Sequence, residues 1–427
     1  MNSKIIDRRE HLLGGSLSLS YSEPLHIVRG EGTYLFDVEG RRYLDCVNNV
    51  CHVGHCHPRV VRAAHEQMQR LNTNTRYLHE TVLNLAERLS GKLPDHLNVS
   101  FFVCSGSEAN ELALRLARSA TDRRDVCVLE GAYHGSTGTL IELSPHKFRG
   151  TGGFPAPDHV HVAPVPDGYR TAREVPPPSR AAHFVDLLET TLSQAAARKR
   201  PIGTFLAEAM PGCAGQIDPP AGYLQQAFQV ARAAGAVAVA DEVQTGFGRM
   251  GSHFWAFERQ GAVPDVVTLG KPIGNGHPLA AVVTTRAIAE AFDNGMEYFN
   301  TFGGNPVSCA VGLAVLDVIE EEGLQEKALA TGEFLLAGLR SLQRRFEILG
   351  DVRGAGLFLG AELVRDRETL EPADSEAQRL VEYAVQRGVL LSTDGPGRNV
   401  IKIKPPLVFS QADAERLLET IEAGLAG

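Results

Sequence analysis

The sequence contains no apolar stretch that approaches the roughly 20 residues a membrane-spanning helix needs. Its first residues, MNSKIIDRREHLLGG, carry charges but no central apolar segment, so we expect no secretory signal. Basic residues are not in excess, because the formal net charge is −9. A nucleic-acid-binding surface needs clustered lysine and arginine. We therefore expect neither a membrane nor a nucleic acid as a partner.

Cysteine is also scarce, with seven residues scattered through 427 positions. This odd number does not indicate a disulfide framework, and reduced thiols are typical of a cytoplasmic protein. One motif, CHVGHCHP at 51–58, resembles half of a metal site. However, no second ligand pair follows at zinc-finger spacing, and His57-Pro58 is typical of a helix start. We therefore expect a cytoplasmic protein without a bound metal.

The patterns that are present predict an α/β protein. Strand and helix patterns alternate from about residue 98 to 285, which is typical of a largely parallel sheet. Beyond residue 306, a long helical run at 307–347 and Gly-punctuated strands predict a small α+β domain. Residues 144–180 are rich in proline, glycine and histidine and have no periodicity, so we expect a loop there.

Two short apolar runs are each followed by a polar side chain, one an acid and the other an amine. Residues 236–240 lead into Asp241, and residues 266–269 lead to Lys271. Such runs are typical of buried parallel strands, and ligands of open α/β sheets lie beyond the carboxyl ends of these strands. An acid and a lysine facing one ligand suit pyridoxal 5′-phosphate (PLP), whose aldehyde forms a Schiff base and whose ring nitrogen pairs with an acid.

Other strand ends carry further candidates. Ser105-Gly106-Ser107 opens a helix, where free N–H groups and the helix dipole attract phosphate, although a plain serine cap is the commoner explanation. Tyr133 follows a strand end and has the flat side chain that stacks on a planar ring, although it is equally a half-buried loop residue. Glu208 and Gln244 would lie near any ligand that Asp241 and Lys271 hold.

Seven motifs together resemble the class III (ω-type) aminotransferases, which are fold type I PLP enzymes. The resemblance covers nearly the whole chain. The motifs are YLDCVNNVCHVGHCHP, SGSEANELALRLAR, GAYHGSTG, DEVQTGFGR, LGKPIGNGHPLAAV, TFGGNPVSCA and GDVRGAGLFLGAEL. The resemblance implies a large domain with a mostly parallel sheet and a small α+β domain formed by both termini. We expect the small domain at 1–55 and 311–427, and the large PLP-binding domain at 56–310.

The resemblance also implies roles for individual residues. Lys271 would be the Schiff-base lysine, Asp241 the partner of the pyridine nitrogen, and Gly106 with Ser107 the phosphate site. The remaining cofactor contacts would be stacking by Tyr133, contacts near the phenolic oxygen by Gln244 and Glu208, and a phosphate contact by Thr301 in the neighbouring subunit. The resemblance thus implies a homodimer with shared sites, with a tetramer left open.

Two departures from the family pattern indicate which reaction of the family this chain catalyses. In typical members an arginine binds the carboxylate of the amino acceptor, and a glutamate often controls access to that arginine. This chain has Cys213 at the position of the glutamate and Lys402 at the position of the arginine. A lysine is a point charge that suits phosphate as well as carboxylate. With LNTNTRYLHE and RNVIKIKPPLVF, these departures resemble the phospho-lyase branch of the family, whose members act on ethanolamine phosphate or 5-phosphohydroxylysine.

We therefore expect a PLP-dependent carbon–oxygen lyase that removes phosphate and ammonia from a phosphorylated amine, with phosphoethanolamine preferred because no second anion clamp is evident. An ω-aminotransferase and a 5-phosphohydroxylysine phospho-lyase are the alternatives. The substrate phosphate would meet basic or hydroxyl side chains outside the cofactor motifs. The candidates are Arg76, Lys402, Arg398 and Tyr21, with Lys404 on the same strand face as Lys402. A helix-end salt bridge is an equal alternative for Arg76.

Overall fold

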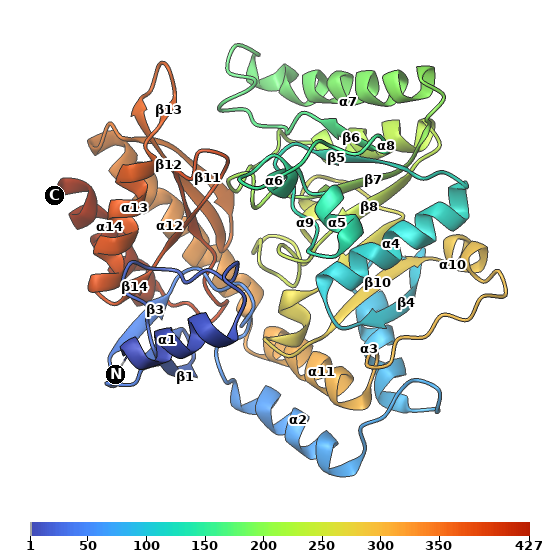
Figure 1. The fold of residues 1–427 in the computed structure, drawn as a ribbon, viewed down its shortest axis with the longest axis horizontal. Coiled ribbons are helices and arrows are strands. Elements are labelled where there is room, and N and C mark those ends of the chain that lie inside the picture. The colour runs from blue at the N-terminus through green and yellow to red at the C-terminus, as the bar shows by residue number, and fades with distance from the viewer. Residues whose placement is uncertain (1) are drawn as a thin grey trace.

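The computed structural model describes residues 2–427, so Met1, the first residue of the expected N-terminal segment, lies outside the described residues. Figure 1 shows two parts side by side. One is built around a large sheet, and the other brings the N-terminal elements, in blue, beside the C-terminal elements, in orange and red. This arrangement confirms the expected fold class.

The large sheet has seven strands in the order β4-β10-β9-β8-β7-β5-β6. The strands are β4 (Leu97–Val103), β5 (Asp125–Leu129), β6 (Val160–Ala163), β7 (Ile202–Glu208), β8 (Val237–Asp241), β9 (Val266–Leu269) and β10 (Ala280–Thr285). The pairs β6/β5, β5/β7, β7/β8 and β8/β9 are parallel, and β10 is antiparallel to both of its neighbours. The carboxyl ends of all strands except β10 therefore meet at one edge of the sheet.

Alternation along the strands explains why helices cover both faces of this sheet. In β8, Val237 and Val239 belong to one apolar cluster, while Ala238 and Ala240 belong to another. Successive strand side chains point to opposite faces. The first cluster includes residues of α4 (Gly106–Thr121), and the second includes residues of α7 (Arg180–Ala197) and α8 (Tyr223–Ala233). Burial on both faces accounts for the uninterrupted apolar runs in the sequence.

The second part contains two smaller sheets. One has the order β1-β2-β3-β14, from β1 (Ile27–Glu31), β2 (Tyr34–Asp37), β3 (Arg42–Asp45) and β14 (Val389–Leu390). The other has the order β11-β12-β16-β15, from β11 (Leu349–Ala355), β12 (Phe358–Asp366), β16 (Val400–Ile403) and β15 (Ser392–Asp394), with β13 (Glu371–Pro372) paired to β12. Because β14 pairs with β3, both ends of the chain build one sheet.

The remaining elements are helices. Before the large sheet come α1 (Asn2–Leu12), α2 (Pro58–Arg70) and α3 (Glu80–Ser90). Within its connections lie α5 (Gly138–Glu142), α6 (Pro145–Phe148), η1 (Pro177–Ser179), α9 (Ala256–Arg259), η2 (Lys271–Gly274) and α10 (Arg286–Phe292). After it follow α11 (Pro306–Glu321), α12 (Leu324–Arg345), α13 (Asp374–Gln386) and α14 (Gln411–Ala426). Among residues 2–427, no helix combines the length and apolar character that crossing a bilayer requires.

Two expectations from the sequence need correction. The segment 144–180 is not only a loop, because it contains α6 and the edge strand β6. The helical run 307–347 is two helices, which separate at Gly323, a residue with φ of +59°. The boundary expected at 310/311 falls inside α11, which packs against α2 and α3. The domain limits therefore stay a prediction, and a boundary after α11 agrees better with this packing.

Candidate active site

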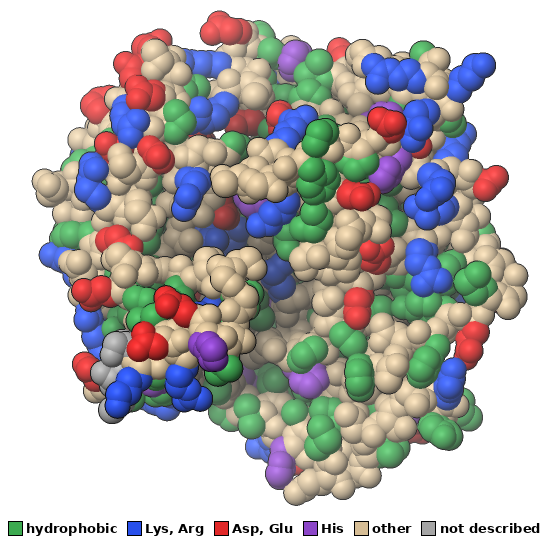
Figure 2. All heavy atoms as spheres, in the orientation of Figure 1, with side chains coloured by type: hydrophobic (Ala, Val, Ile, Leu, Met, Phe, Trp, Pro, Cys, Tyr) green, Lys and Arg blue, Asp and Glu red, His purple; other side chains and the backbone are tan. Residues whose placement is uncertain are grey.

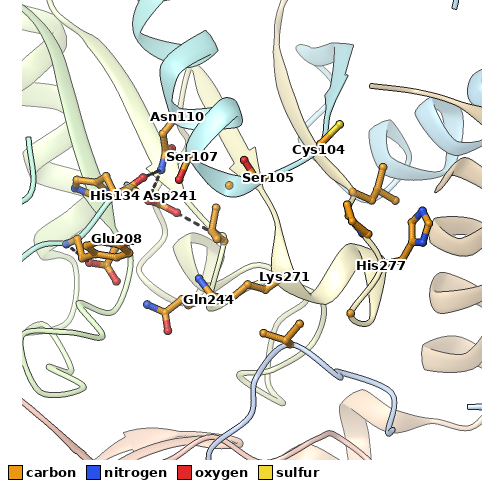
Figure 3. Close-up of a pocket in the computed structure, with 18 residues that line it drawn as sticks. Cys104, Ser105, Ser107, Asn110, His134, Glu208, Asp241, Gln244, Lys271 and His277 are labelled. Atoms are coloured by element: carbon orange, nitrogen blue, oxygen red, sulfur yellow. Dashed lines mark hydrogen bonds and ion pairs between the residues drawn. The ribbon is translucent and has the colours of Figure 1, made fainter. Parts of the chain in front are cut away.

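The carboxyl ends of five strands of the large sheet surround one cavity of about 460 Å³. Register explains why the acids meet, because Glu208 lies opposite Asp241 in the β7/β8 pair and Asp241 lies opposite Thr268 in the β8/β9 pair. The lining includes Cys104, Ser105, Gly106, Ser107, Asn110, Tyr133, His134, Glu208, Asp241, Val243, Gln244, Lys271 and His277. Figure 3 shows these side chains converging from separate elements.

Asp241 is buried at the end of β8, and its carboxylate is held on both oxygens. Oδ2 accepts hydrogen bonds from Asn110 Nδ2 at 2.9 Å and from His134 Nδ1 at 2.8 Å, and Oδ1 accepts one from the N–H of Val243 at 3.1 Å (Figure 3). Asn110 also donates to the carbonyl of His134 at 2.8 Å, which fixes the pair. These contacts hold the carboxyl group in one orientation at the base of the cavity.

Lys271 begins η2, two residues beyond the end of β9. Its backbone has φ of +31°, a left-handed value that is rare for a residue with a side chain and that is often found at functional sites. Burial lowers the pKa of Lys271, with Asp241 acting in the opposite direction. A lysine with a lowered pKa carries more neutral amine, which is the nucleophilic form. This amine faces the same cavity as Asp241.

The N-terminus of α4 forms a cradle for an anion. In the described part of the chain, the backbone N–H groups of Gly106 and Ser107 have no hydrogen-bond partner, because the Ser105 hydroxyl caps the N–H of Glu108 at 3.2 Å instead. A Cβ atom at Gly106 would lie 2.7 Å from Val243 Cγ1, so only glycine permits this close approach to β8. Free N–H groups and the helix dipole make this turn suitable for phosphate.

Three further candidates line the same cavity. Burial raises the pKa of Glu208, which accepts hydrogen bonds from the N–H groups of Gly212 at 3.0 Å and Tyr133 at 3.4 Å. Burial also raises the pKa of Tyr133. Gln244 Oε1 accepts from Asn49 Nδ2 at 3.0 Å. The structure thus brings Gly106, Ser107, Tyr133, Glu208, Asp241, Gln244 and Lys271 together around one cavity.

Lys402 and Lys404 form a basic cluster beside this cavity. Lys404 Nζ lies 3.3 Å from Gln244 Oε1, so it directly adjoins the cavity lining. The two ammonium groups share the carboxylate of Asp394, with one oxygen 3.3 Å from each Nζ. Lys404 is almost fully buried and Lys402 is half-buried. Figure 2 shows basic side chains inside the hollow between the two parts of the molecule.

Within one chain, Tyr21 and Arg398 do not line this cavity, and their contact with the substrate phosphate stays a prediction. They line a separate cavity of about 570 Å³ between the N-terminal segment and α13. The hydroxyl of Tyr21 donates to the carbonyl of Leu391 at 3.2 Å, and Arg398 is exposed.

Arg76 and Thr301 also lie outside the cavity lining of their own chain. Both are exposed. The Arg76 guanidinium pairs with Glu297 at 2.9 Å and stacks on the ring of Phe299 at 4.0 Å. The loops that carry Arg76 and Thr301 are neighbours, because a Cβ atom at Gly304 would lie 2.8 Å from Thr75 Cγ2. Within one chain, these two residues therefore form part of an exposed surface.

Reasoning from the sequence missed Asn110, His134 and Asp394. Asn110 and His134 both donate hydrogen bonds to Asp241. Their positions in the sequence could have indicated them, because Asn110 lies in the first turns of the helix after Ser105 and His134 follows Tyr133 in GAYHGSTG. Asp394 had no comparable signal. Conversely, the residues of CHVGHCHP bind other groups: His52 Nε2 donates to the carbonyl of Phe247 at 2.7 Å, and His55 Nε2 lies 2.8 Å from Asp45.

These residues fit PLP. The cradle of Gly106 and Ser107 offers free N–H donors to the cofactor phosphate. The fixed carboxylate of Asp241 suits a protonated ring nitrogen, and the buried amine of Lys271 suits an aldehyde. The fold and the site together define a PLP-dependent enzyme.

Comparisons with known proteins agree. The Aminotransferase class-III family matches residues 18–425. "Alanine–glyoxylate aminotransferase 2-like" of Drosophila melanogaster is 51% identical, over 97% of this chain and 85% of its own length. "Ethanolamine-phosphate phospho-lyase homolog 1" of Caenorhabditis elegans is 40% identical, over 98% of this chain and 92% of its own length. A solved phospholyase from Arthrobacter in complex with phosphoethanolamine superimposes with a TM-score of 0.94 at 39% identity, covering 99% of both chains.

The chain belongs to the class III aminotransferase family, and its cofactor is PLP. The similarity to a phospho-lyase homolog and to a solved phospholyase agrees with the branch expected from Cys213 and Lys402.

Proposed function

We propose that this protein is a PLP-dependent phospho-lyase that converts phosphoethanolamine and water into acetaldehyde, ammonia and phosphate. The observation that carries this proposal is the pair Lys402 and Lys404 beside the cavity that holds Lys271. Two ammonium groups match the charge of a phosphate dianion, whereas an ordinary carboxylate substrate needs only one cation. The solved Arthrobacter phospholyase, which contains phosphoethanolamine, supports this substrate class.

When bound, PLP joins the substrate nitrogen and withdraws electrons from the neighbouring carbon. Lys271 is positioned to hold the cofactor and then, as a free amine, to remove a proton from the carbon that bears nitrogen. Asp241, fixed by Asn110 and His134, keeps the ring nitrogen protonated. Removal of the carbon proton by Lys271 would let the phosphate leave the adjacent carbon with its bonding electron pair. Lys271 would then replace the product nitrogen on the cofactor, and the released enamine would react with water to give acetaldehyde and ammonia.

We propose that the substrate phosphate is bound by Lys404 and Lys402, with Arg76 contributed by a partner subunit. Lys404 adjoins Gln244 at the cavity, whereas Arg76 is exposed in its own chain. In the same way, Thr301 would contact the cofactor phosphate of the neighbouring site. Apolar side chains that are exposed on the same surface support a homodimer: Tyr77, Leu78, Leu83, Met296 and Phe302.

One incubation tests the function. The holoenzyme is mixed with phosphoethanolamine without any keto acid, and free phosphate and acetaldehyde are measured. We expect equal amounts of both products. No phosphate release here, together with transfer of the amino group to pyruvate in a second incubation that contains it, would favour an ω-aminotransferase, the alternative that the name of the Drosophila relative supports.

A parallel incubation with 5-phosphohydroxylysine tests the second alternative. Its carboxylate needs a cation of its own, and Lys402 and Lys404 are already assigned to the substrate phosphate. We therefore expect a lower kcat/KM for this substrate than for phosphoethanolamine. A higher value would reverse the choice of substrate. The cytoplasmic location expected from the sequence stays a prediction, which fractionation of cells that express the protein would test.

A further inference from the structure

Asp394, at the end of β15, carries a carboxylate placed between the two lysines, and its side chain is 12% exposed. Oδ1 lies 3.3 Å from Lys402 Nζ, Oδ2 lies 3.3 Å from Lys404 Nζ, and Oδ2 also accepts a hydrogen bond from Gln216 Nε2 at 2.7 Å. We propose that Asp394 is a positioning residue that occupies the anion site of Lys402 and Lys404, keeps both lysines charged, and gives way when the substrate phosphate arrives. This inference rests on the proposed phosphate site.

The contacts of Asp394 with the lysines are loose enough to be replaced. Both are 3.3 Å long, whereas charge-assisted N–H···O bonds are usually about 2.7–2.9 Å. An ammonium group has three donors. Within residues 2–427, Lys402 donates to Asp394 alone and Lys404 to Asp394 and Gln244, so both retain donors for an arriving anion.

Asp394 keeps one hydrogen-bond partner, Gln216, when its contacts with the two lysines are broken. Gln216 is buried, and its Nε2 also donates to the carbonyl of Gly212 at 2.8 Å, which holds the amide in place. The N–H of Gly395 donates to the carbonyl of Cys213 at 3.1 Å, which anchors the backbone next to Asp394. Only the carboxylate side chain therefore has to turn from the lysines towards Gln216.

The lysines need a counter-ion because their surroundings disfavour positive charge. The side chain of Lys404 is only 4% exposed and that of Lys402 is 25% exposed. An ammonium group that is buried without a negative partner loses its proton more easily. The Asp394 carboxylate is the negative charge that lies beside both ammonium groups.

Other ionisable groups face this cluster from the elements packed around it. They are Glu208 at the end of β7, Cys213 in the following loop, Lys271 at the start of η2, and His146 on α6. Burial alone would raise the pKa of Asp394, but Lys404 and Lys402 reverse this effect and hold the pKa below its usual value. Burial raises the pKa of Cys213 to about 12, so this neighbour is an uncharged thiol near neutral pH.

The test measures the affinity of the holoenzyme for inorganic phosphate at pH 7.5 and 9.5, where most of the phosphate is a dianion. Phosphate affinity should fall between pH 7.5 and 9.5 in both proteins. We expect this fall to be at least tenfold larger in Asp394→Asn than in the wild type, because without the carboxylate the lysines should lose their protons at a lower pH. KM for phosphoethanolamine should change more than kcat, and Asp394→Glu should restore most of the wild-type profile. Asp374→Asn, an exposed matched control, should behave as the wild type.

A second variant has an effect of opposite sign. Lys402→Met removes a like charge beside Lys404, so phosphate affinity should persist to higher pH than in the wild type, although it is weaker at pH 7.5. This variant keeps the proposal testable if Asp394→Asn does not fold. The proposal is wrong if Asp394→Asn loses affinity equally at both pH values, or if Lys402→Met does not shift the profile.

Failure of this proposal is distinct from failure of the proposed function. Phosphate release from phosphoethanolamine by the wild-type enzyme tests the function, whereas inorganic phosphate tests the anion site without any turnover. An enzyme that releases phosphate but has unchanged pH profiles in both variants would retain the function and overturn the role of Asp394.

Discussion

At the scale of single residues, Lys271 is the amine on which the proposed chemistry depends. Lys271→Ala removes both the group that holds the cofactor and the base for the carbon proton, so phosphate release should fall by roughly 10³-fold or more. Release of phosphate is measured under saturating phosphoethanolamine. The absorbance of the bound cofactor should change as well, because its covalent link to the chain is lost.

Lys327→Ala is the matched control for Lys271→Ala, since Lys327 is exposed on α12. Its turnover and cofactor absorbance should equal those of the wild type. If Lys271→Ala retained most of its phosphate release, Lys271 would not be the base.

The two lysines beside the cavity should differ from Arg398 in their effect on substrate binding. For Lys404→Ala, we expect KM for phosphoethanolamine to rise about 10- to 100-fold, because a charge-assisted hydrogen bond contributes about 1.5–3 kcal/mol. Lys402→Ala should have a smaller effect, since Lys402 is more exposed and farther from Gln244. Steady-state kinetics of phosphate release gives these values.

Arg398→Ala is the control that separates the two cavities. Arg398 lies with Tyr21 in the other cavity, so its loss should leave KM within about twofold of the wild type. A rise as large as that of Lys404→Ala would mean that Arg398 reaches the substrate after all.

At the scale of elements, the close approach of α4 to β8 depends on Gly106. A methyl group at this position would lie 2.7 Å from Val243 Cγ1, so Gly106→Ala should destabilise the fold by about 1–3 kcal/mol and weaken cofactor binding. Equilibrium unfolding in denaturant and cofactor titration measure the two effects. The double variant Gly106→Ala/Val243→Ala should recover part of both losses, and no recovery would show that the clash is not their cause.

The bond between His55 and Asp45 predicts how stability depends on pH. Burial alone would lower the pKa of His55, but its hydrogen bond with the buried Asp45 outweighs this and raises the pKa to about 10. Between the unfolded value of 6.5 and pH 10, the folded chain holds more protons than the unfolded chain. The stabilisation is therefore complete below about pH 6.5 and is lost as the pH rises through 10.

Denaturant unfolding of His55→Gln at pH 7 to 10 tests this dependence. The free energy of unfolding should fall less steeply with pH in His55→Gln than in the wild type. His11→Gln, an exposed control on α1, should keep the wild-type slope. Equal slopes in all three proteins would contradict a raised pKa of His55.

The sequence predicted elements best where short-range rules suffice. The strand Val237–Asp241 was predicted from the apolar run 236–240, which leads into an acid. The strand Val160–Ala163 was missed, because it is a short edge strand among prolines and glycines. The sequence predicted that Asp241 and Lys271 meet at one sheet edge. It did not predict that Asp394 meets Lys402 and Lys404, since this contact depends on the register in which β15 pairs with β16.

At the scale of the whole molecule, the surface that carries Arg76 has no partner within one chain. Val61 and Met68 on α2 are exposed, as are Leu78 and Phe302. A second copy of the chain would cover such a surface and would place Arg76 and Thr301 at its sites. Light scattering should therefore give the mass of a dimer or of a dimer of dimers.

Mixed dimers test whether Arg76 acts across the interface. Lys271→Ala and Arg76→Ala are each impaired alone, but a mixed dimer would contain one site with the wild-type Lys271 of one subunit and the wild-type Arg76 of the other. Unfolding and refolding the two variants together should therefore restore activity above that of either parent. Each variant refolded alone is the control, and the absence of any restoration would place Arg76 in its own subunit's site or outside both.

The pairing of β3 with β14 has a consequence for the synthesis of the protein. The hydroxyl of Tyr21 and its acceptor Leu391, next to β14, are 370 residues apart in the chain. At ribosomal rates of about 5–20 residues per second, the N-terminal strands wait roughly 20–75 s for their partner. The large sheet is contiguous in sequence and is able to form during this interval. The emerging N-terminal segment, with its uncovered apolar residues, is therefore the part of the nascent chain that chaperones would bind for longest.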